Sequence, residues 1–401
     1  MLQLLTPATL LVIFATLGGS AAASESGSVS IRQKMIAKPH HGLPPAQLLL
    51  RAYNKYAKAG AVPPVKLSKA AQNEGTVVAT PLTNDVSYLC PVTIGLQTFY
   101  LEFDSGSSDL WVQSSLSPAN LSVGHSVYNP RRSPTAKLLP GYTWNITYGD
   151  RSGARGVVFT DTVDVGGVVA TGQAVEAATA VSAEFTGQHG SDGLLGLAFS
   201  AINTVRPVKQ RTFFDNVKPG LRNKLWTVDL KHQATGTFDF GVIKPSKYKG
   251  DITYTPVDPS TGFWTFFPSG FKVGRQPKVT GNQGASIADT GSSLLYVQQQ
   301  AAFAYYAQVP GSTLYRGSIF IYPCNQVLPN FSVYIEGRQF TIPGRYLKYA
   351  VMHGNKCVGG IQGSAGLPFN IYGDIFLKAV FAVFDESQGQ PRLGFAKKDL
   401  V

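Results

Sequence analysis

Two short acidic loops repeat along the chain, and their residue types could do chemistry. The first reads Asp104-Ser-Gly-Ser-Ser, and the second, 185 positions later, reads Asp289-Thr-Gly-Ser-Ser. Each lies between two apolar runs that are typical of β-strands. A single Asp-Thr-Gly is common by chance. Two such loops in the same context indicate duplicated lobes that each contribute one carboxylate.

A pair of carboxylates facing one water molecule can hydrolyse an amide without a metal or a nucleophilic side chain. One carboxylate acts as general base on the water, and the other acts as general acid on the substrate. Two like charges at such a distance cannot both ionise, so the pair shares one proton over a wide acidic range. We expect Asp104 and Asp289 to form this pair, and the sequence does not assign which is the base.

The neighbours in each loop are predicted to support the pair: Ser105, Gly106, Ser107, Thr290, Gly291 and Ser292. The glycines would let the two loops approach closely. The hydroxyl next to each aspartate would hydrogen-bond across to the opposite loop, and the later serine would donate to an outer carboxylate oxygen. Three other aspartates lack the Asp-x-Gly context and are predicted to be structural: Asp109, Asp374 and Asp385.

The elements around these loops also repeat. An apolar run with a central glycine follows each loop, at residues 194–199 and at residues 371–376. Low charge (14%), 42 glycines and many Val, Thr, Tyr and Phe residues favour an all-β body with many turns. The 401 residues are enough for two ordinary domains.

These motifs, in this order and spacing, resemble those of pepsin-family aspartic endopeptidases, specifically the fungal penicillopepsin and aspergillopepsin type. The likeness is strongest at residues 191–205 and 371–385 and runs from about Val77 to the end of the chain. The resemblance implies two pseudo-twofold-related β lobes, a central cleft and a β-hairpin flap. It implies cleavage of protein and peptide substrates at acid pH beside large hydrophobic residues. It also implies a monomer without a cofactor that pepstatin-like compounds inhibit.

A predicted hairpin at residues 143–159 has the turn Tyr148-Gly149-Asp150-Arg151-Ser152 at its tip. By resemblance it is the substrate-binding flap, and Trp111 orients the Tyr148 hydroxyl; plain core packing of Trp111 is the alternative. The resemblance also matches Asp150 to an acidic residue through which fungal relatives accept Lys beside the cut. Arg151, where relatives have Gly or a small polar residue, could weaken that preference.

The N-terminal part differs in composition. Residues 1–23 are predicted to be a secretory signal with an apolar centre and a small-residue cleavage site, too short to span a membrane. Residues 24–69 are basic and are predicted to be an inhibitory propeptide that ends at Lys69-Ala70, with a helical pattern at residues 45–56. By resemblance, Lys55 of the Lys55-Tyr56 pair places its ammonium between the catalytic carboxylates. A solvated basic linker is the alternative.

The two lobes are predicted at residues 70–225 and 226–401, each with one Asp loop. The net charge of +12 could suggest a nucleic-acid partner, but no groove-reading helix, aromatic-interleaved basic stripe or zinc spacing is present. We therefore interpret the charge as surface solubility. The histidines show no metal-ligand spacing, and no lipid-anchor signal ends the chain. A secreted, extracellular protein is expected.

Three cysteines in a secreted chain leave one unpaired. Cys324 and Cys357 match a disulfide of the family, and Cys90 is predicted to be a buried, inert thiol. Three N-glycosylation sequons begin at Asn120, Asn145 and Asn330.

Two alternative functions remain open. The first is a catalytically silent pepsin-like binding or inhibitor protein, which would usually have lost an aspartate or the flap tyrosine. The second is a serine hydrolase, but the chain has no Gly-x-Ser-x-Gly elbow.

Overall fold

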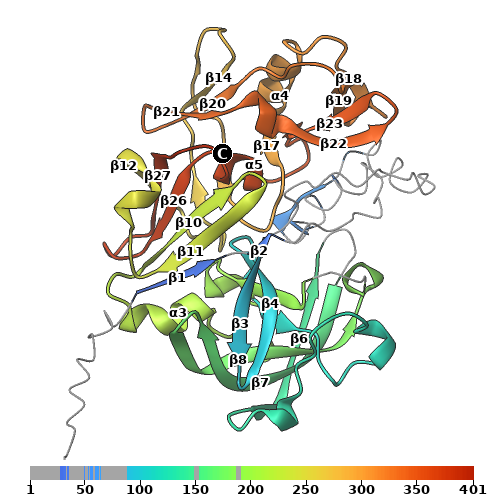
Figure 1. Cartoon of the computed structure of the whole chain (residues 1–401), viewed down its shortest axis with the longest axis vertical. Helices are drawn as coiled ribbons and strands as arrows, with labels where there is room; N and C mark the ends of the chain where they lie inside the picture. Colours follow the sequence, from blue (N-terminus) through green and yellow to red (C-terminus); the bar gives the residue numbers. More distant parts are fainter. Residues whose placement is uncertain are drawn as a thin grey trace, which may run out of the picture.

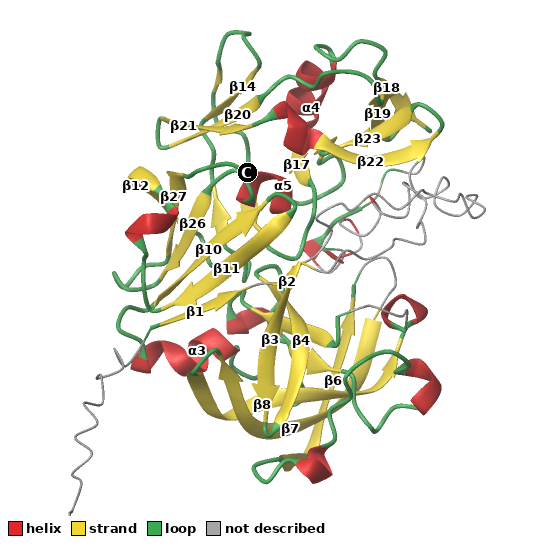
Figure 2. Ribbon diagram, viewed as in Figure 1, coloured by secondary structure: helices red, strands yellow, loops and turns green. Residues whose placement is uncertain are grey.

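The computed structural model describes residues 28–32, 34–35, 49, 53, 55–56, 59–62, 64, 88–148, 153–186 and 191–401. The predicted signal segment and the Lys69-Ala70 junction lie outside these residues. Strands dominate, and the helices are short (Figure 2). The chain forms two β lobes with a sheet between them, which confirms the predicted all-β, bilobal fold (Figure 1).

The first lobe is built on an eight-stranded sheet, in cyan to green in Figure 1. Its order is β2 (Lys34–Met35), β3 (Tyr88–Ile94), β4 (Gln97–Asp104), β9 (Gly193–Gly196), β5 (Leu110–Val112), β8 (Val168–Val181), β7 (Gly153–Val165) and β6 (Lys137–Thr147). Strands β6 and β7 pair antiparallel and form the predicted hairpin.

The first Asp loop leaves the sheet between β4 and β5. Strand β9 lies between these two strands, parallel to β4 and antiparallel to β5. Its register places Gly196 opposite Asp104. Because both strands that flank the loop are held by one buried strand, the aspartate at the end of β4 has a fixed position.

The second lobe repeats this arrangement. Its central sheet has the order β13 (Thr265–Phe266), β16 (Ser286–Ala288), β25 (Asn370–Tyr372), β17 (Leu295–Val297) and β24 (Ile361–Gly363). Strand β25 is parallel to β16 and antiparallel to β17, as β9 is to β4 and β5. The two repeats seen in the sequence are therefore repeats of topology.

Two smaller sheets complete the second lobe, in orange in Figure 1. They contain β15 (Val279–Thr280), β14 (Gly270–Val273), β20 (Phe331–Ile335) and β21 (Arg338–Ile342) in one, and β18 (Thr313–Tyr315), β19 (Ile319–Pro323), β23 (Lys356–Gly359) and β22 (Lys348–His353) in the other. Among residues 191–401, the short α-helices are α3 (Phe213–Val217), α4 (Gln299–Tyr306) and α5 (Asp374–Leu377).

A six-stranded sheet joins the lobes. Its order is β1 (Val29–Arg32), β11 (Ala234–Phe240), β10 (Leu225–Lys231), β26 (Phe381–Asp385), β27 (Arg392–Lys397) and β12 (Lys249–Pro256). Its core is aromatic: Trp226 stacks on Phe384 at 3.8 Å between ring centroids, and Phe238 contacts Phe103 of the first lobe at 5.0 Å. Most strands of this sheet come from residues 226–401, but β1 comes from residues 24–69. Sequence patterns did not predict a strand in that segment.

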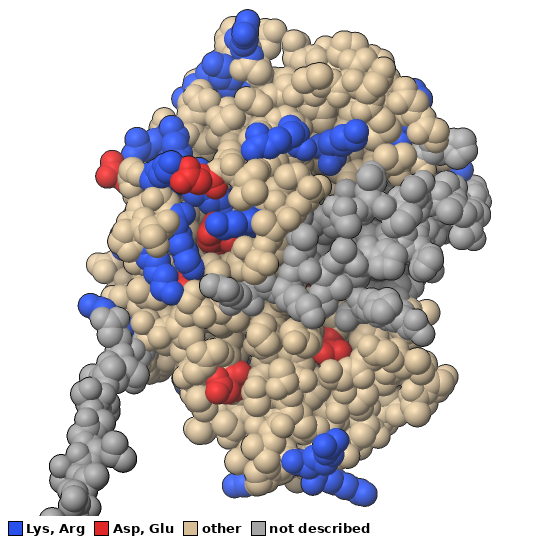
Figure 3. Space-filling model, in the orientation of Figure 1, with Lys and Arg blue, Asp and Glu red and all other residues tan. Residues whose placement is uncertain are grey.

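Of the two lobes, the second carries the net positive charge. Residues 226–401 contain 16 Lys or Arg and 10 Asp or Glu, and half of these acids are buried: Asp229, Asp239, Asp289, Asp374 and Asp385. On the face drawn in Figure 3, most Lys and Arg side chains lie over this lobe. The burial of acids rather than an excess of lysines alone makes this surface basic.

Candidate active site

Asp104 and Asp289 come from the two lobes and meet in the buried centre of the molecule. Asp104 ends β4, and Asp289 directly follows β16. Their exposed fractions are 1% and 0%. The close approach of carboxylates from the two repeats, predicted from their spacing and context, is present.

Reciprocal hydrogen bonds join the two loops. The Ser105 backbone N–H donates to Thr290 Oγ1, and the Thr290 backbone N–H donates to Ser105 Oγ, each at 2.9 Å. Each hydroxyl then donates to a carbonyl at the end of the opposite strand, Ser105 to Ala288 at 2.9 Å and Thr290 to Phe103 at 2.7 Å. The loops are thus held in one relative orientation.

Each carboxylate is also bonded within its own loop. The inner oxygens accept backbone N–H groups, from Gly106 to Asp104 Oδ1 at 2.8 Å and from Gly291 to Asp289 Oδ1 at 3.0 Å. The outer oxygens accept a serine hydroxyl each. The donors are Ser107 to Asp104 Oδ2 and Ser292 to Asp289 Oδ2. The two carboxyl groups therefore accept matching hydrogen bonds from their own loops.

Glycine is required at the third loop position because the opposite aspartate lies against it. A Cβ on Gly291 would stand 2.3 Å from Asp104 Oδ1, and one on Gly106 would stand 2.6 Å from Asp289 Oδ1. Real side chains do not tolerate such contacts. The predicted role of these glycines in the close approach of the loops follows directly.

Lys55 and Tyr56 occupy the space between the carboxylates. Lys55 Nζ lies 2.9 Å from Asp104 Oδ1 and 2.9 and 2.8 Å from the two oxygens of Asp289. The Tyr56 hydroxyl donates to Asp289 Oδ2 at 2.5 Å. Lys55 therefore contacts both carboxylates, and Tyr56 contacts one of them.

The segment that carries Lys55 is anchored by apolar side chains. Leu49, Tyr53 and Tyr56 are all buried. The Tyr56 ring contacts Phe263 and Phe369 of the second lobe at 5.4 and 4.8 Å between centroids. Leu49, Tyr53 and Lys55 are helical, and the remaining positions of the helix predicted at 45–56, except Tyr56, lie outside the described residues.

Burial and the Lys55 ammonium decide the protonation of the centre. Burial raises the pKa of Asp104, and the neighbouring Asp289 charge adds to this, while Lys55 opposes it. Burial acts on Asp289 in the same direction. There, however, the charge and hydrogen bonds of Lys55, with those of Ser292 and Tyr56, outweigh burial and lower the pKa. For Lys55, burial lowers the pKa, but the two carboxylates outweigh it and the pKa is raised.

The hairpin β6–β7 brings Tyr148 to the site. The Trp111 indole N–H donates to the Tyr148 hydroxyl at 2.8 Å. Trp111 is also fully buried and stacks against Trp144, so it contacts both the Tyr148 hydroxyl and the core. Gly149, Asp150, Arg151 and Ser152 lie outside the described residues.

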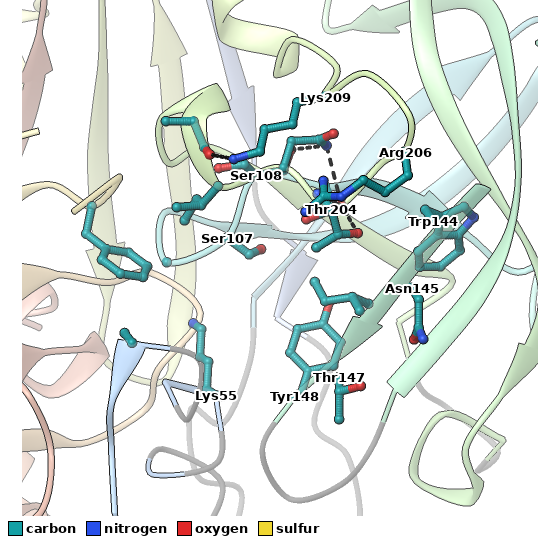
Figure 4. A pocket seen from close by; sticks show the side chains of 18 of the residues that line it. Lys55, Ser107, Ser108, Trp144, Asn145, Thr147, Tyr148, Thr204, Arg206 and Lys209 are labelled. Carbon is teal, nitrogen blue, oxygen red and sulfur yellow. Dashed lines mark hydrogen bonds between the residues drawn. The ribbon is translucent and has the colours of Figure 1, made fainter. Parts of the chain in front are cut away.

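A cavity of about 470 Å³ opens beside the carboxylates. The first Asp loop, the hairpin, residues 201–209 and the Lys55 segment line it, with Phe263 on the second lobe. Figure 4 shows Arg206 and Lys209 on one side of this space and Lys55 and Tyr148 on the other. The family likeness at residues 191–205 did not predict that residues 201–209 would border a cavity, since nothing local marks them as a cavity wall.

Residues 87–398 match the family model described as eukaryotic aspartyl protease. The chain belongs to this family. It is 51% identical over 324 residues to penicillopepsin-1 of Penicillium janthinellum, covering 80% of this chain and 98% of that one. It is 49% identical over 348 residues to aspergillopepsin-1 of Aspergillus fumigatus, covering 86% of each chain.

Two further comparisons agree. Podosporapepsin of Podospora anserina is 43% identical over 397 residues, which cover 94% of this chain and 92% of that one. The aspartic proteinase from Irpex lacteus has the same fold, with a TM-score of 0.64 at 24% identity, over 79% of this chain and 95% of that one. The protein is an aspartic endopeptidase, and the catalytically silent alternative gains no support.

The remaining carboxylates of this aspartyl protease are held in structural contacts. Asp385 binds Arg392 at 2.8 Å, and Asp374 begins α5. Asp109 Oδ1 accepts the backbone N–H and the hydroxyl of Thr204 at 2.9 and 2.7 Å. Burial and the Asp109 charge raise the pKa of Glu176, a buried carboxyl on β8 that sequence patterns did not single out.

The cysteines follow the predicted pairing. Cys324 and Cys357 form a disulfide, and Cys90 is free and buried in β3. All three sequon asparagines are exposed, and Asn330 also accepts the Gly344 N–H at 2.9 Å.

Within the described part of the chain, no group of three or more His, Cys, Asp or Glu residues could hold a metal. None of the helices described there has the length and apolar character needed to cross a membrane.

Proposed function

We propose that this protein is a secreted endopeptidase, made as an inactive precursor, in which Asp104 and Asp289 jointly activate a water molecule at acid pH. The observation that carries the proposal is that both carboxylates reach one atom, Lys55 Nζ, at 2.8–2.9 Å. A water at that point, once Lys55 has left, can hydrogen-bond to both.

The reaction follows from this geometry. The ionised carboxylate takes a proton from the water as it attacks the peptide carbonyl carbon, and the protonated carboxyl hydrogen-bonds to the carbonyl oxygen. The proton taken from the water then passes to the peptide nitrogen, the C–N bond breaks to release the amine and the new carboxylic acid, and the pair keeps one shared proton as at the start. The fixed serine and glycine donors stabilise the shared charge, and the pair acts as a unit without an assigned base.

The test compares Asp104→Asn and Asp289→Asn with Asp251→Asn, whose side chain is 93% exposed. Cleavage of denatured haemoglobin at acid pH should be lost in both site variants, kept in Asp251→Asn, and inhibited by pepstatin in the wild type. Cleavage that persists in either site variant would exclude the dyad.

Residues 24–69 are proposed to be the inhibitory segment, after a signal at residues 1–23. Lys55 bound to both carboxylates supports this, as does the start of the family match at residue 87. N-terminal sequencing of the protein secreted from its own full-length gene should find a mature start near Ala70. A start that leaves Lys55 in the active enzyme would contradict the proposal.

The substrate is proposed to be an extended peptide with large apolar residues beside the cut. A cleft between two β lobes binds such a chain through backbone hydrogen bonds, with pockets for alternate side chains. We further propose that Asp150 allows Lys there. The test uses two peptides that differ only in having Phe or Lys beside the cut. Asp150→Asn should reduce cleavage of the Lys peptide relative to cleavage of the Phe peptide.

A further inference from the structure

Two cations border the cavity beside the first Asp loop. Arg206 and Lys209 line the same cavity as Gly106 and Ser107. Figure 4 shows both cations on the side of the cavity that faces Tyr148 and Lys55. A substrate that passes the carboxylates along this cavity would therefore pass these two charges.

Both cations are held against the cavity wall. The Arg206 backbone exchanges hydrogen bonds with Thr143 of β6, at 2.8 and 3.0 Å, and its Nη1 donates to the Val205 carbonyl at 2.9 Å. Lys209 Nζ donates to the Ala201 carbonyl. A guanidinium has five N–H donors and an ammonium has three, so both retain donors for a ligand.

Their charges are not neutralised by nearby acids. In the ranges of the chain that the structure describes, no carboxylate forms an ion pair with Arg206 or Lys209. Asp109 also lines the cavity, but it is 1% exposed and already accepts two hydrogen bonds from Thr204. This end of the cavity is therefore positively charged.

We propose that Arg206 and Lys209 form a subsite for a carboxylate side chain of the peptide substrate, Asp or Glu, beyond the residues next to the cut. The inference rests on the proposed function and adds to it a substrate class. An extended peptide rises about 3.3 Å per residue and points alternate side chains to one face, so one position should meet the two cations.

The size of the effect follows from the exposure of the pair. Arg206 and Lys209 are solvent-exposed, and exposed ion pairs contribute about 0.2–1 kcal/mol each. The expected gain in kcat/KM for Glu over Gln at the matching position is therefore about twofold to thirtyfold for both cations together.

The experiment uses acid-activated enzyme made from the full chain. Peptides share one cut between large apolar residues, and Glu or Gln stands at the second or third position on either side of it. Enzymes are the wild type, Arg206→Gln, Lys209→Gln, the double variant and the charge-keeping Arg206→Lys. Lys137→Gln is the control, because Lys137 is an exposed cation of the same lobe outside the cavity lining.

The Glu/Gln ratio of kcat/KM is the readout. It should exceed 1 at one position, fall toward 1 in the double variant, and stay high in Arg206→Lys and Lys137→Gln. It should also fall toward 1 at pH 3.5 relative to pH 5.5, because Glu ionises near pH 4.3, and at 0.5 M salt.

Two results would overturn the subsite. One is a ratio of 1 or less at every position in the wild type, and the other is a ratio that the double variant leaves unchanged. If the double variant does not fold, the single variants and the pH and salt dependence of the wild type decide the matter. Failure to cleave the Gln peptides, or cleavage that survives Asp104→Asn, would instead contradict the proposed function.

Discussion

Ser105 and Thr290 exchange hydrogen bonds across the two Asp loops, with the backbone N–H of each donating to the hydroxyl of the other at 2.9 Å. Because each hydroxyl also donates to a carbonyl of the opposite strand, four buried bonds tie the lobes together at the carboxylates. One loop has Ser where the other has Thr. The bonding pattern is the same, since it needs only the hydroxyl.

Thr290→Val should therefore destabilise the protein much more than Thr290→Ser. Valine keeps the shape but leaves the Ser105 N–H and the Phe103 carbonyl without partners, and each buried unpaired group costs about 1–3 kcal/mol. We expect a loss of about 2–6 kcal/mol for Thr290→Val. The serine variant should lose roughly 1 kcal/mol, the value of one buried methyl group. Urea unfolding measures both, and equal stabilities would show that the hydroxyl does not hold the loops.

Lys55→Met should weaken latency at neutral pH. The Lys55 ammonium forms ion pairs with both carboxylates. In the methionine variant, the segment would cover the two carboxylates without supplying a positive charge to them. In the closed state, in which Lys55 contacts the carboxylates, the pKa of Asp289 is lowered. The contact therefore stabilises this state at pH values above the ordinary Asp pKa, and the stabilisation is lost as the pH falls through the lowered pKa. Activation of the wild type should therefore need acid.

The measurement is peptidase activity of freshly secreted full-length protein at pH 6–7. Lys249→Met, at a lysine that is 63% exposed, is the matched control. The Lys55 variant should show activity that the wild type and the control lack. Equal latency of all three proteins would mean that the segment blocks the cleft without help from this charge.

The sequence predicted the features that local patterns encode. Asp104 and Asp289 were found because each stands in a short motif between apolar strands, and the repeat of the following strands predicted the matching topology. The contacts of Arg206 and Glu176 could not be predicted in this way. Each depends on residues distant in sequence, such as Thr143 for Arg206 and Asn203 for Glu176, that only the folded sheets bring together.

The segment before the first lobe shows the same limit. The Lys55-Tyr56 pair was found by resemblance, and the helical pattern around it was visible. Strand β1, at Val29–Arg32, was not predicted because its partner β11 lies some 200 residues further along the chain. A short strand without a hairpin partner carries too weak a pattern, and its pairing is decided by tertiary context.

Glu176→Gln should make the free energy of unfolding fall less steeply as the pH rises. Glu176 is 1% exposed, accepts Asn203 Nδ2 at 3.0 Å, and hydrogen-bonds Asp109. The groups that act on its charge are Asp109 and Asn203, and its charge in turn acts on the Tyr148 hydroxyl; none of these is a cation. Burial and the Asp109 charge raise the pKa of Glu176, so its stabilising contribution is full below the unfolded value near 4.3 and is lost as pH rises toward the folded value.

Between the unfolded and folded pKa values of Glu176, the free energy of unfolding of the wild type should fall by about 1.4 kcal/mol more per pH unit than that of Glu176→Gln. Glutamine stays neutral and can still donate to Asp109. Urea unfolding of the full chain at pH 5, 6, 7 and 8 should therefore show a steeper loss in the wild type and in the exposed control Glu336→Gln than in Glu176→Gln. Parallel pH profiles for all three would show that Glu176 is ionised in the fold or does not sense pH.

Removal of the disulfide should destabilise the second lobe. Cys324 and Cys357 are 33 positions apart, and closing such a loop restricts the unfolded chain by about 3–4 kcal/mol in the chain-entropy treatment. The double variant Cys324→Ala with Cys357→Ala should lose about that much in urea unfolding. A reductant should lower the stability of the wild type and of Cys90→Ala, because Cys90 is the free thiol, but should leave the double variant unchanged. If the reductant lowered the stability of the double variant as much as that of the wild type, it would not be acting through the Cys324–Cys357 bond.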